Sequence, residues 1–390
     1  MDEKKRNDLL RTDIGMRSPF ALAGARLKTQ IPWRELSTEA AKGYLYKAFH
    51  IEYSRLFDPD IKYRSPLYPR EGREVLKAGS GKEYLLRRRT GATPCTASVA
   101  RWATLDWTYP APPPPASSTS PGGPYGIDVM QGCAADCYFV AALSSVAWTS
   151  PTLLQGKPDT SSPPRHKYKF YAPAATSNLK VGRSIAVDAG DGIVFAHPMD
   201  GDSVWPSVYE KAYAVFRKIQ PVETPDITQL NTGNPATTLF EITGLPIDAR
   251  FVREFSPERL FEFISTKCGG AGVAGRTLCP LVTWTYHDST CTPRGDRYED
   301  DLIPADHSFS ILGTGYVDDR PCIVLRNPFG ISVADPVKEG IAEWDWASWT
   351  PSSHLSPAPP GDPPVRPRDG NFAMEVEAFT RYFEAVGHIV

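Results

Sequence analysis

The chain has 390 residues, and its 43 basic and 45 acidic residues leave a net charge of −2. This balance argues against a nucleic-acid-binding protein that works through a strong basic field. No run approaches the ~18 apolar residues of a membrane span, and the charged N-terminus has no apolar segment of a secretory signal. The 7 cysteines are therefore expected to be reduced thiols in a cytoplasmic protein.

Two proline-rich stretches, residues 110–124 and 351–367, divide the chain. The first cannot form a helix or a central strand, so we expect an extended linker. It separates residues 1–109, an N-terminal region of unknown role, from the rest of the chain. Within that region, residues 37–53 have the apolar spacing of a helix. The second stretch is expected to be a surface loop.

After the linker, the pattern predicts helices first and strands later. Residues 137–147 are apolar and alanine-rich, and residues 205–218 form a second expected helix with Pro206 in its first turn. Three later segments are rich in β-branched and aromatic residues and are expected to be strands, namely 281–286, 309–317 and 322–329. Asp318 and Asp319 are expected to form a hairpin turn between two of them.

Cys137 lies where a loop of small and polar residues enters the first expected helix. A helix N-terminus favours the thiolate, because its unpaired N–H groups and the macrodipole stabilise negative charge. Gln131, six residues upstream, has a side-chain amide that can stabilise an oxyanion together with the backbone N–H of Cys137. On these residues alone, a buried structural cysteine remains an alternative.

His307 and Asn327 begin and end two expected strands and are 20 residues apart. Antiparallel pairing of these strands would place the two side chains next to each other. A thiolate needs an imidazole as proton acceptor and donor, and an Asn oxygen can fix the tautomer and plane of that imidazole. Phe329 could shield their hydrogen bond from water. Taken alone, a histidine such as His307 is more often an ordinary surface or core residue.

Five ordered segments together resemble the calpain family of cysteine peptidases. QGCAADCYFVAAL (residues 131–143) resembles its active-site motif, and LRNPFG (325–330) is similar to its Arg-Asn-Pro-Trp-Gly motif. The other segments are WPSVYEKAYA (205–214), ATTLFEITG (236–244) and DGNFAMEVEAFTRYF (369–383). The resemblance implies an α+β, papain-like core of two lobes. The helical lobe would be residues 125–225 and the antiparallel β lobe residues 226–390, with the extra region 1–109 in front.

The resemblance also implies roles for individual residues. Cys137 would be the nucleophile, His307 the general base and then acid, and Asn327 the residue that orients His307. Gln131 would help to form the oxyanion hole. Gly233, Asp306 and Phe329 are candidates for contact with substrate.

Several residues depart from the family pattern, among them Ala135 in place of Gly before Asp-Cys, Tyr138 in place of Trp after Cys137, and Ala373 in place of a later Trp. Two further departures lie beside the expected histidine and asparagine. Asp306 stands where Gly commonly precedes the histidine, and it is expected to alter substrate choice or to raise the pKa of the imidazole. Phe329 stands where Trp is usual, which keeps the shielding role.

Calcium is possible but not expected, and no cofactor is expected to be required. The weak candidate calcium ligands are Asp128, Asp202 and Asp369. Acidic residues common in the family are replaced by Ser203, Val333 and Asn371. Calcium needs six to eight oxygen ligands, so the loss of carboxylates weakens its binding steeply.

These features together predict a calpain-like cysteine endopeptidase that hydrolyses peptide bonds through a thioester. Its partner is a protein or peptide substrate, with no nucleic acid and no membrane span. One alternative is an acyltransferase that passes the same acyl group to an amine and forms an amide. Two others are a non-catalytic scaffold with this fold, and a bound inhibitor or toxin-like module whose N-terminal region recruits a partner.

Overall fold

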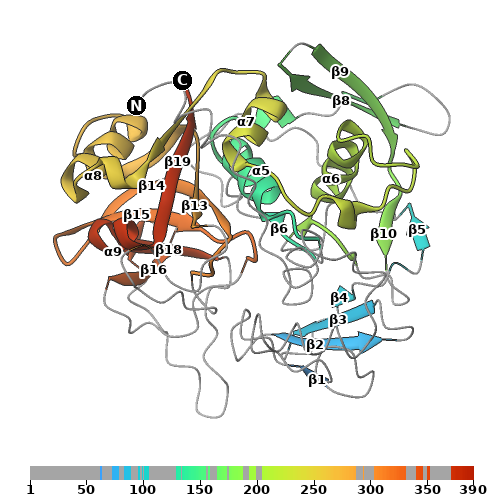
Figure 1. Cartoon of the computed structure of the whole chain (residues 1–390), viewed down its shortest axis with the longest axis horizontal. Coiled ribbons are helices and arrows are strands. Elements are labelled where there is room, and N and C mark those ends of the chain that lie inside the picture. The colour runs from blue at the N-terminus through green and yellow to red at the C-terminus, as the bar shows by residue number, and fades with distance from the viewer. Residues whose placement is uncertain are drawn as a thin grey trace.

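The described part of the chain consists of helices and antiparallel sheets (Figure 1). The structure is a computed structural model of the whole chain. Apart from a small N-terminal sheet, it describes residues 99, 101–104, 129–132, 134–154, 157–158, 165–173, 175–187, 193–198, 204–286, 293, 303–330, 340–345, 349–351 and 370–390. The N-terminal sheet has the order β1-β2-β3-β4 and comprises β1 (Lys62–Tyr63), β2 (Arg73–Ala78), β3 (Glu83–Arg88) and β4 (Cys95–Thr96).

An eight-stranded sheet, with the order β12-β19-β13-β14-β15-β18-β16-β17, organises the C-terminal part. Its pairings are all antiparallel. The strands are β12 (Ile247–Phe251), β13 (Gly275–Thr285), β14 (Ser308–Val317), β15 (Arg320–Arg326), β16 (Ile341–Asp345), β17 (Thr350–Pro351), β18 (Asn371–Glu375) and β19 (Phe383–Ile389). The three segments predicted as strands are β13, β14 and β15, so that prediction is confirmed.

Three helices precede or flank this sheet: α5 (Cys137–Thr149), α6 (Trp205–Phe216) and α7 (Pro235–Thr243). Every residue of α5 from Cys137 to Trp148 is buried, as its uniformly apolar composition predicts. α7 begins at a capped end, where the Asn234 side chain accepts hydrogen bonds from the amides of Ala236 and Thr237. Both predicted helices are confirmed as α5 and α6.

The two faces of the large sheet are covered by different helices (Figure 1). α5 packs on one face, where Val282 and Trp284 of β13 join the same core cluster as α5, α6 and α7. α8 (Pro257–Ser265) and α9 (Val376–Tyr382) pack on the other face, in a cluster with Phe309 and Leu325. The start of α5 therefore lies against the sheet that carries the predicted histidine and asparagine.

Smaller elements complete the part around α6. They are the pair β5 (Arg101–Ala103) with β10 (Ile185–Val187), the pair β6 (Val129–Met130) with β11 (His197–Pro198), and the sheet β7 (Lys157–Pro158), β8 (Arg165–Ala172) and β9 (Ala175–Gly182). Single 3-10 turns lie at η3 (Pro151–Leu154), η4 (Ile227–Gln229), η5 (Val252–Glu254) and η6 (Thr266–Cys268). The β8–β9 hairpin shows that this half of the chain is not purely helical.

β5 lies inside the predicted N-terminal region 1–109, yet it pairs in register with β10, with Trp102 opposite Ala186. The other described strands of that region pair among themselves. The boundary at residue 109 stays a prediction. A truncation designed to test the role of the N-terminal region should retain β5, because its removal would expose the edge of β10.

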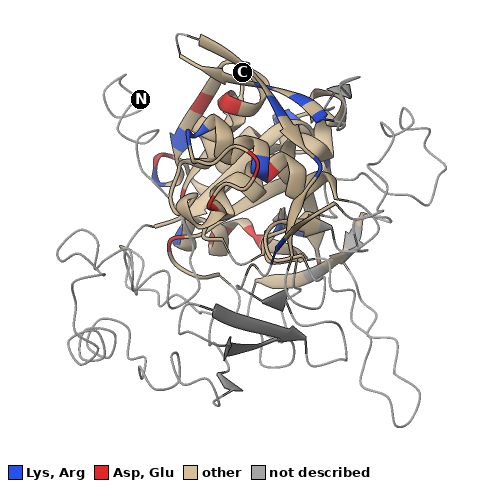
Figure 2. Ribbon diagram, turned by 90° about the vertical axis from the view of Figure 1, so that its right-hand side faces the viewer, with Lys and Arg blue, Asp and Glu red and all other residues tan. Residues whose placement is uncertain are grey.

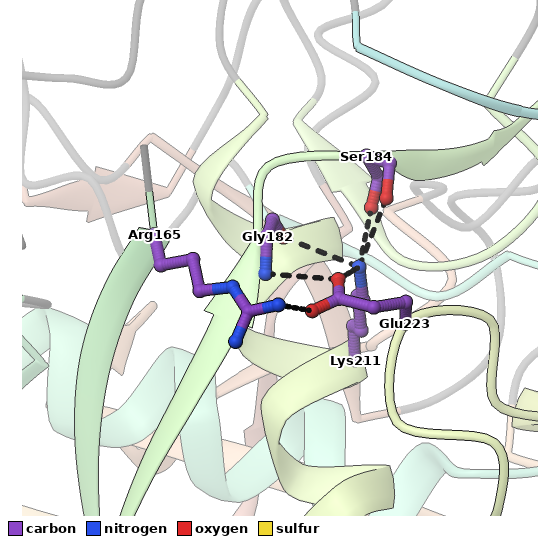
Figure 3. A network of polar contacts seen from close by, with 5 residues as sticks. All are labelled: Arg165, Gly182, Ser184, Lys211 and Glu223. Atoms are coloured by element: carbon purple, nitrogen blue, oxygen red, sulfur yellow. Dashed lines mark hydrogen bonds and ion pairs between the residues drawn. The ribbon is translucent and has the colours of Figure 1, made fainter. Parts of the chain in front are cut away.

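Lys211 of α6 is buried in a polar network that ties α6 to this edge (Figure 3). Its ammonium donates to the carbonyl oxygens of Gly182 and Ser184, both at 3.2 Å, and to the Ser184 hydroxyl at 3.0 Å. Glu223 supplies the countercharge at 3.3 Å and also pairs with Arg165 at 3.0 Å. A buried cation needs this degree of hydrogen bonding and pairing.

Several predictions fall on segments outside the described residues: the helix at 37–53, the linker 110–124 and almost all of the loop 351–367. The Asp318–Asp319 turn is confirmed, since both residues have positive φ, 50° and 62°, as in a two-residue hairpin loop.

Basic and acidic residues are interspersed over the described ribbon (Figure 2). None of the helices in the described part is long and apolar enough to cross a membrane.

Candidate active site

Cys137 is the first residue of α5 and is fully buried. The described residues before it, 131–132 and 134–136, follow β6 without helix or strand, and the amides of Phe139 and Val140 already bond back to the carbonyl oxygen of Asp136. The thiol therefore lies at the positive end of a helix of 13 residues. Such a position stabilises a thiolate, as the sequence predicts.

His307 and Asn327 form a hydrogen bond of 2.9 Å between Nε2 and Oδ1. The Asn327 oxygen also accepts the backbone N–H of Phe329 at 3.0 Å. Because a backbone amide can only donate, the atom facing it is the oxygen, and His307 Nε2 must be the donor. His307 Nδ1, which has no hydrogen-bond partner among the described residues, then carries the lone pair. This tautomer can accept a proton.

Phe329 covers the imidazole, with ring centroids 4.5 Å apart and an interplanar angle of 26°. Phe309 contacts the same ring edge-on at 4.8 Å. Burial lowers the pKa of His307 to about 3, against the opposing effect of its hydrogen bond to Asn327. The imidazole is therefore neutral in the resting site at neutral pH.

Cys137 and His307 lie at the same end of two packed elements. The Ser310 hydroxyl donates to the carbonyl oxygen of Ala141 at 2.7 Å, and the Trp148 indole donates to the carbonyl oxygen of Leu312 at 3.1 Å. α5 and β14 therefore run in the same direction. Cys137 starts α5, and His307 immediately precedes β14.

Gln131 joins the two parts of the site. Its backbone N–H donates to the carbonyl oxygen of Pro328 at 2.8 Å, and its side-chain Nε2 donates to the carbonyl oxygen of Ala134 at 2.7 Å. Next to it, a Cβ on Gly132 would lie 2.3 Å from the carbonyl oxygen of Phe195, so only glycine fits there. The amide of Gln131 is thus held between the loop before Cys137 and the loop after Asn327.

Residues 97–389 match the sequence family described as calpain family cysteine protease. The chain belongs to the calpain family. A thiol protease of Porphyromonas gingivalis (strain ATCC BAA-308 / W83) is 26% identical over 246 residues, which cover 56% of this chain and 47% of that protein. Calpain-9 of Homo sapiens is 25% identical over 242 residues, 60% of this chain and 31% of that protein. This calpain-family chain spans less than half the length of these relatives.

Of the predicted substrate contacts, Gly233 and Asp306 flank the site of this calpain-family chain. A Cβ on Gly233 would lie 2.3 Å from the ring of Tyr138, the residue after Cys137, so close packing explains the glycine. Asp306 directly precedes His307 and is buried with φ of 56°. The expected rise in the pKa of His307 is wrong, because burial lowers it and Asp306 is not among the groups that shift it. Contact with substrate stays a prediction for both residues.

The left-handed backbone at Asp306 explains why calpain-family chains commonly have glycine here. We expect Asp306→Gly to change the free energy of unfolding by less than about 1 kcal/mol, since relief of the left-handed backbone offsets the greater freedom of glycine in the unfolded chain. Asp306→Val should destabilise by about 1–3 kcal/mol, because a β-branched residue resists positive φ. Urea unfolding monitored by circular dichroism measures both changes.

The matched control is Asp318, which has φ of 50° in an exposed hairpin turn. Asp318→Gly and Asp318→Val should show the same order of stabilities. Ordinary point mutations lower the free energy of unfolding by about 0.5–3 kcal/mol. If Asp306→Gly alone lowered it by well above about 2 kcal/mol, the carboxyl group rather than the backbone conformation would account for the aspartate at this position.

The calcium candidates Asp128, Asp202 and Asp369 lie outside the described residues. Among the residues that the structure does describe, no group of three or more His, Cys, Asp or Glu side chains could hold a metal ion. Calcium independence of this calpain-family chain therefore stays a prediction.

A pair of buried carboxyl groups lies beside the site and was not predicted from the sequence. Asp136, directly before Cys137, and Glu210, in the middle of α6, are both essentially inaccessible to solvent. A signal was present, because Asp136 lies directly before a uniformly apolar helix and Glu210 lies between the aromatic residues of another, where a charged residue is rarely buried without a partner.

Proposed function

We propose that this chain is a calpain-type cysteine endopeptidase with a papain-like core of two lobes. α5, α6 and α7 would form one lobe, and the eight-stranded sheet with α8 and α9 the other. The observation that carries the proposal is the His307–Asn327 hydrogen bond, whose direction leaves Nδ1 able to accept a proton. Because this hydrogen bond occurs in a chain of the calpain family of cysteine proteases, the Cys137 thiol is the expected donor of that proton.

In the proposed reaction, His307 Nδ1 takes the proton of the Cys137 thiol, and the sulfur attacks a peptide carbonyl carbon. The carbonyl π electrons move to oxygen, and the backbone N–H of Cys137 and the side chain of Gln131 stabilise that oxyanion. When the tetrahedral intermediate collapses, the C–N bond breaks and His307 gives its proton to the leaving amine. Asn327 keeps the ring aligned throughout.

The thioester is then resolved by water. His307 removes a proton from the water, and the water oxygen forms a bond to the thioester carbonyl carbon. When this second tetrahedral intermediate collapses, the C–S bond breaks, a carboxylic acid is released, and the Cys137 sulfur takes the proton back from His307. An amine in place of water would give an amide, which is the acyltransferase alternative. Both outcomes use the same residues and differ only in the acceptor.

Mass spectrometry of a peptide library incubated in H₂¹⁸O with a panel of added amines tests the reaction. Hydrolysis gives a new carboxyl terminus that carries one ¹⁸O. Amide formation instead gives a fragment whose mass exceeds that of the unlabelled carboxylic acid by the mass of the amine less water. Cleavage with ¹⁸O incorporation by the wild type, absent with Cys137→Ala, supports the peptidase. Amine adducts as the dominant product would replace it with the acyltransferase, and no product of either kind would favour the scaffold.

We further expect activity without calcium, because carboxylates that the family uses as ligands are replaced at Ser203 and Asn371. Peptide cleavage in excess EGTA should stay within about twofold of the rate with added calcium, since each of the two expected sites loses at least one carboxylate and calcium needs six to eight oxygen ligands. Initial rates on one cleaved peptide measure this. Magnesium is the control for ionic strength and charge, and loss of activity in chelator that calcium but not magnesium restores would contradict the expectation.

A further inference from the structure

The Asp136 side chain does not do what its position suggests. Asp136 is the residue before the first turn of α5, where an Asp side chain normally accepts an amide hydrogen bond from the helix. Here it forms no such cap. Neither of its carboxyl oxygens accepts a well-formed hydrogen bond from a described residue.

The carboxyl group of Asp136 instead lies against that of Glu210 on α6. One oxygen of Glu210 accepts the backbone N–H of Ala196 at 3.0 Å, and the other has no donor among the described residues. Two ionised carboxylates offer only acceptors, so they would repel each other and leave three buried oxygens without a donor. One proton between them removes the repulsion and pairs one oxygen of Glu210 with one oxygen of Asp136, which leaves a single Asp136 oxygen without a donor among the described residues.

No described cation replaces that proton. Lys211 follows Glu210 in sequence, but its ammonium is directed to Gly182, Ser184 and Glu223 (Figure 3). The titratable neighbours on α5 are Cys137 and Tyr138, which carry no positive charge. On the β11 side, His197 follows Ala196, whose amide bonds Glu210, and the Nδ1 of His197 is bonded to the carbonyl oxygen of Phe195 at 2.8 Å.

We propose that Asp136 and Glu210 share one proton and that this pair is a positioning device for Cys137. The proton lies on Glu210 and is donated to the Asp136 carboxylate, which holds the residue before Cys137 against α6. The pair then carries one negative charge beside the nucleophile instead of two, which makes the thiolate easier to form. Burial raises the pKa of Glu210 well above its usual range and that of Asp136 to about 6, in the direction that this sharing requires.

The stability test needs no catalytic activity. Since the folded state keeps a proton that the unfolded state loses, stability should fall as pH rises above the ordinary range of a carboxyl group, about 4. Glu210→Gln replaces the protonated acid by an amide donor and removes this penalty. The melting temperature of this variant, measured relative to that of the wild type, should therefore increase by about 2–4 °C as the pH is raised from about 5 to about 8. The matched control is Glu262→Gln, the same change at an exposed position of α8, which should show no such gain.

The positioning test rests on the proposed function and measures alkylation of Cys137 by iodoacetamide, resolved by peptide mass spectrometry across pH. Glu210→Gln should react within about twofold of the wild type at neutral pH and exceed it at the alkaline end. Glu210→Leu, which cannot donate, should react at least about 10-fold more slowly, because small displacements of a reactive group are costly.

The two readouts separate the two parts of the proposal. A melting-temperature difference between Glu210→Gln and wild type that does not change with pH would overturn the shared proton. Reactivity of Glu210→Gln as low as that of Glu210→Leu would overturn the positioning role. If Glu210→Leu does not fold, Asp136→Asn takes its place. Cys137 should keep its reactivity in this variant, because the Asn amide can donate to Glu210. Loss of that reactivity would equally overturn the positioning role. The melting-temperature result stands whether or not peptide hydrolysis is found.

Discussion

Cys137→Ala should abolish peptide hydrolysis, with kcat/KM falling by on the order of 10⁴-fold or more, as when the nucleophile of a catalytic triad is removed. The physical reason is that no thioester can form, while the imidazole and the oxyanion donors remain. Cys137 is buried at the start of α5, and alanine there fills less space but keeps the helix. Steady-state kinetics on a peptide found to be cleaved by the wild type measures the loss.

Cys279→Ala is the matched control for this variant. Cys279 is a half-buried thiol in β13 whose pKa is raised by burial, so it is not suited to act as a nucleophile. This variant should retain the wild-type rate. If Cys137→Ala kept more than a few per cent of the activity in a preparation free of other proteases, the nucleophile would have to be another residue.

Gln131→Ala should lower kcat/KM by about 10²–10³-fold, the usual cost of losing one oxyanion donor. An amide has two N–H groups, and one of them is bonded to the carbonyl oxygen of Ala134; we assign the other to the oxyanion. The backbone bond from Gln131 to Pro328 does not depend on the side chain, so the loop should keep its place. Most of the loss should therefore appear in kcat rather than in KM.

Gln131→Glu makes this test more specific, because it keeps the shape of the side chain but removes both N–H groups of the side-chain amide. It should be at least as damaging as alanine. Gln229→Ala, at an exposed glutamine that bonds Asp226, is the control for the change in composition and should be neutral. Gln131→Glu with a rate within about threefold of wild type would show that Gln131 is not an oxyanion donor of the kind described.

The elements whose formation is local could be read from the sequence. α5, α6 and strands β13 to β15 follow from apolar pattern and β-branched content, and the Asp318–Asp319 turn follows from two residues that tolerate positive φ. The β8–β9 hairpin was missed although Tyr168 and Phe170 alternate with exposed lysines, because the alternation is short and the partner strand is mixed in composition and mostly exposed. β5 was missed for a related reason: three residues are too few to predict a strand.

Much of the candidate site could also be predicted, but not its electrostatics. Adjacent strands place His307 beside Asn327, so a 20-residue separation was sufficient to expect their contact. The direction of that hydrogen bond depends on the amide of Phe329, and the low pKa of His307 depends on burial by rings from two segments. The Asp136–Glu210 pair joins residues 74 positions apart, by subtraction of their numbers, on elements that do not pair in register. Sequence spacing carries no information about such contacts.

The position of β19 has a consequence for folding. β19 is the last described strand along the chain, yet it lies between β12 and β13, and Ala385 of β19 packs in the same core cluster as α5. Its pairings join segments that are far apart in the sequence, and such non-local contacts are slow to form because a long loop must be closed first. The sheet surface on which α5 packs is complete only when β19 has paired, so we expect Cys137 to reach its folded position late in folding.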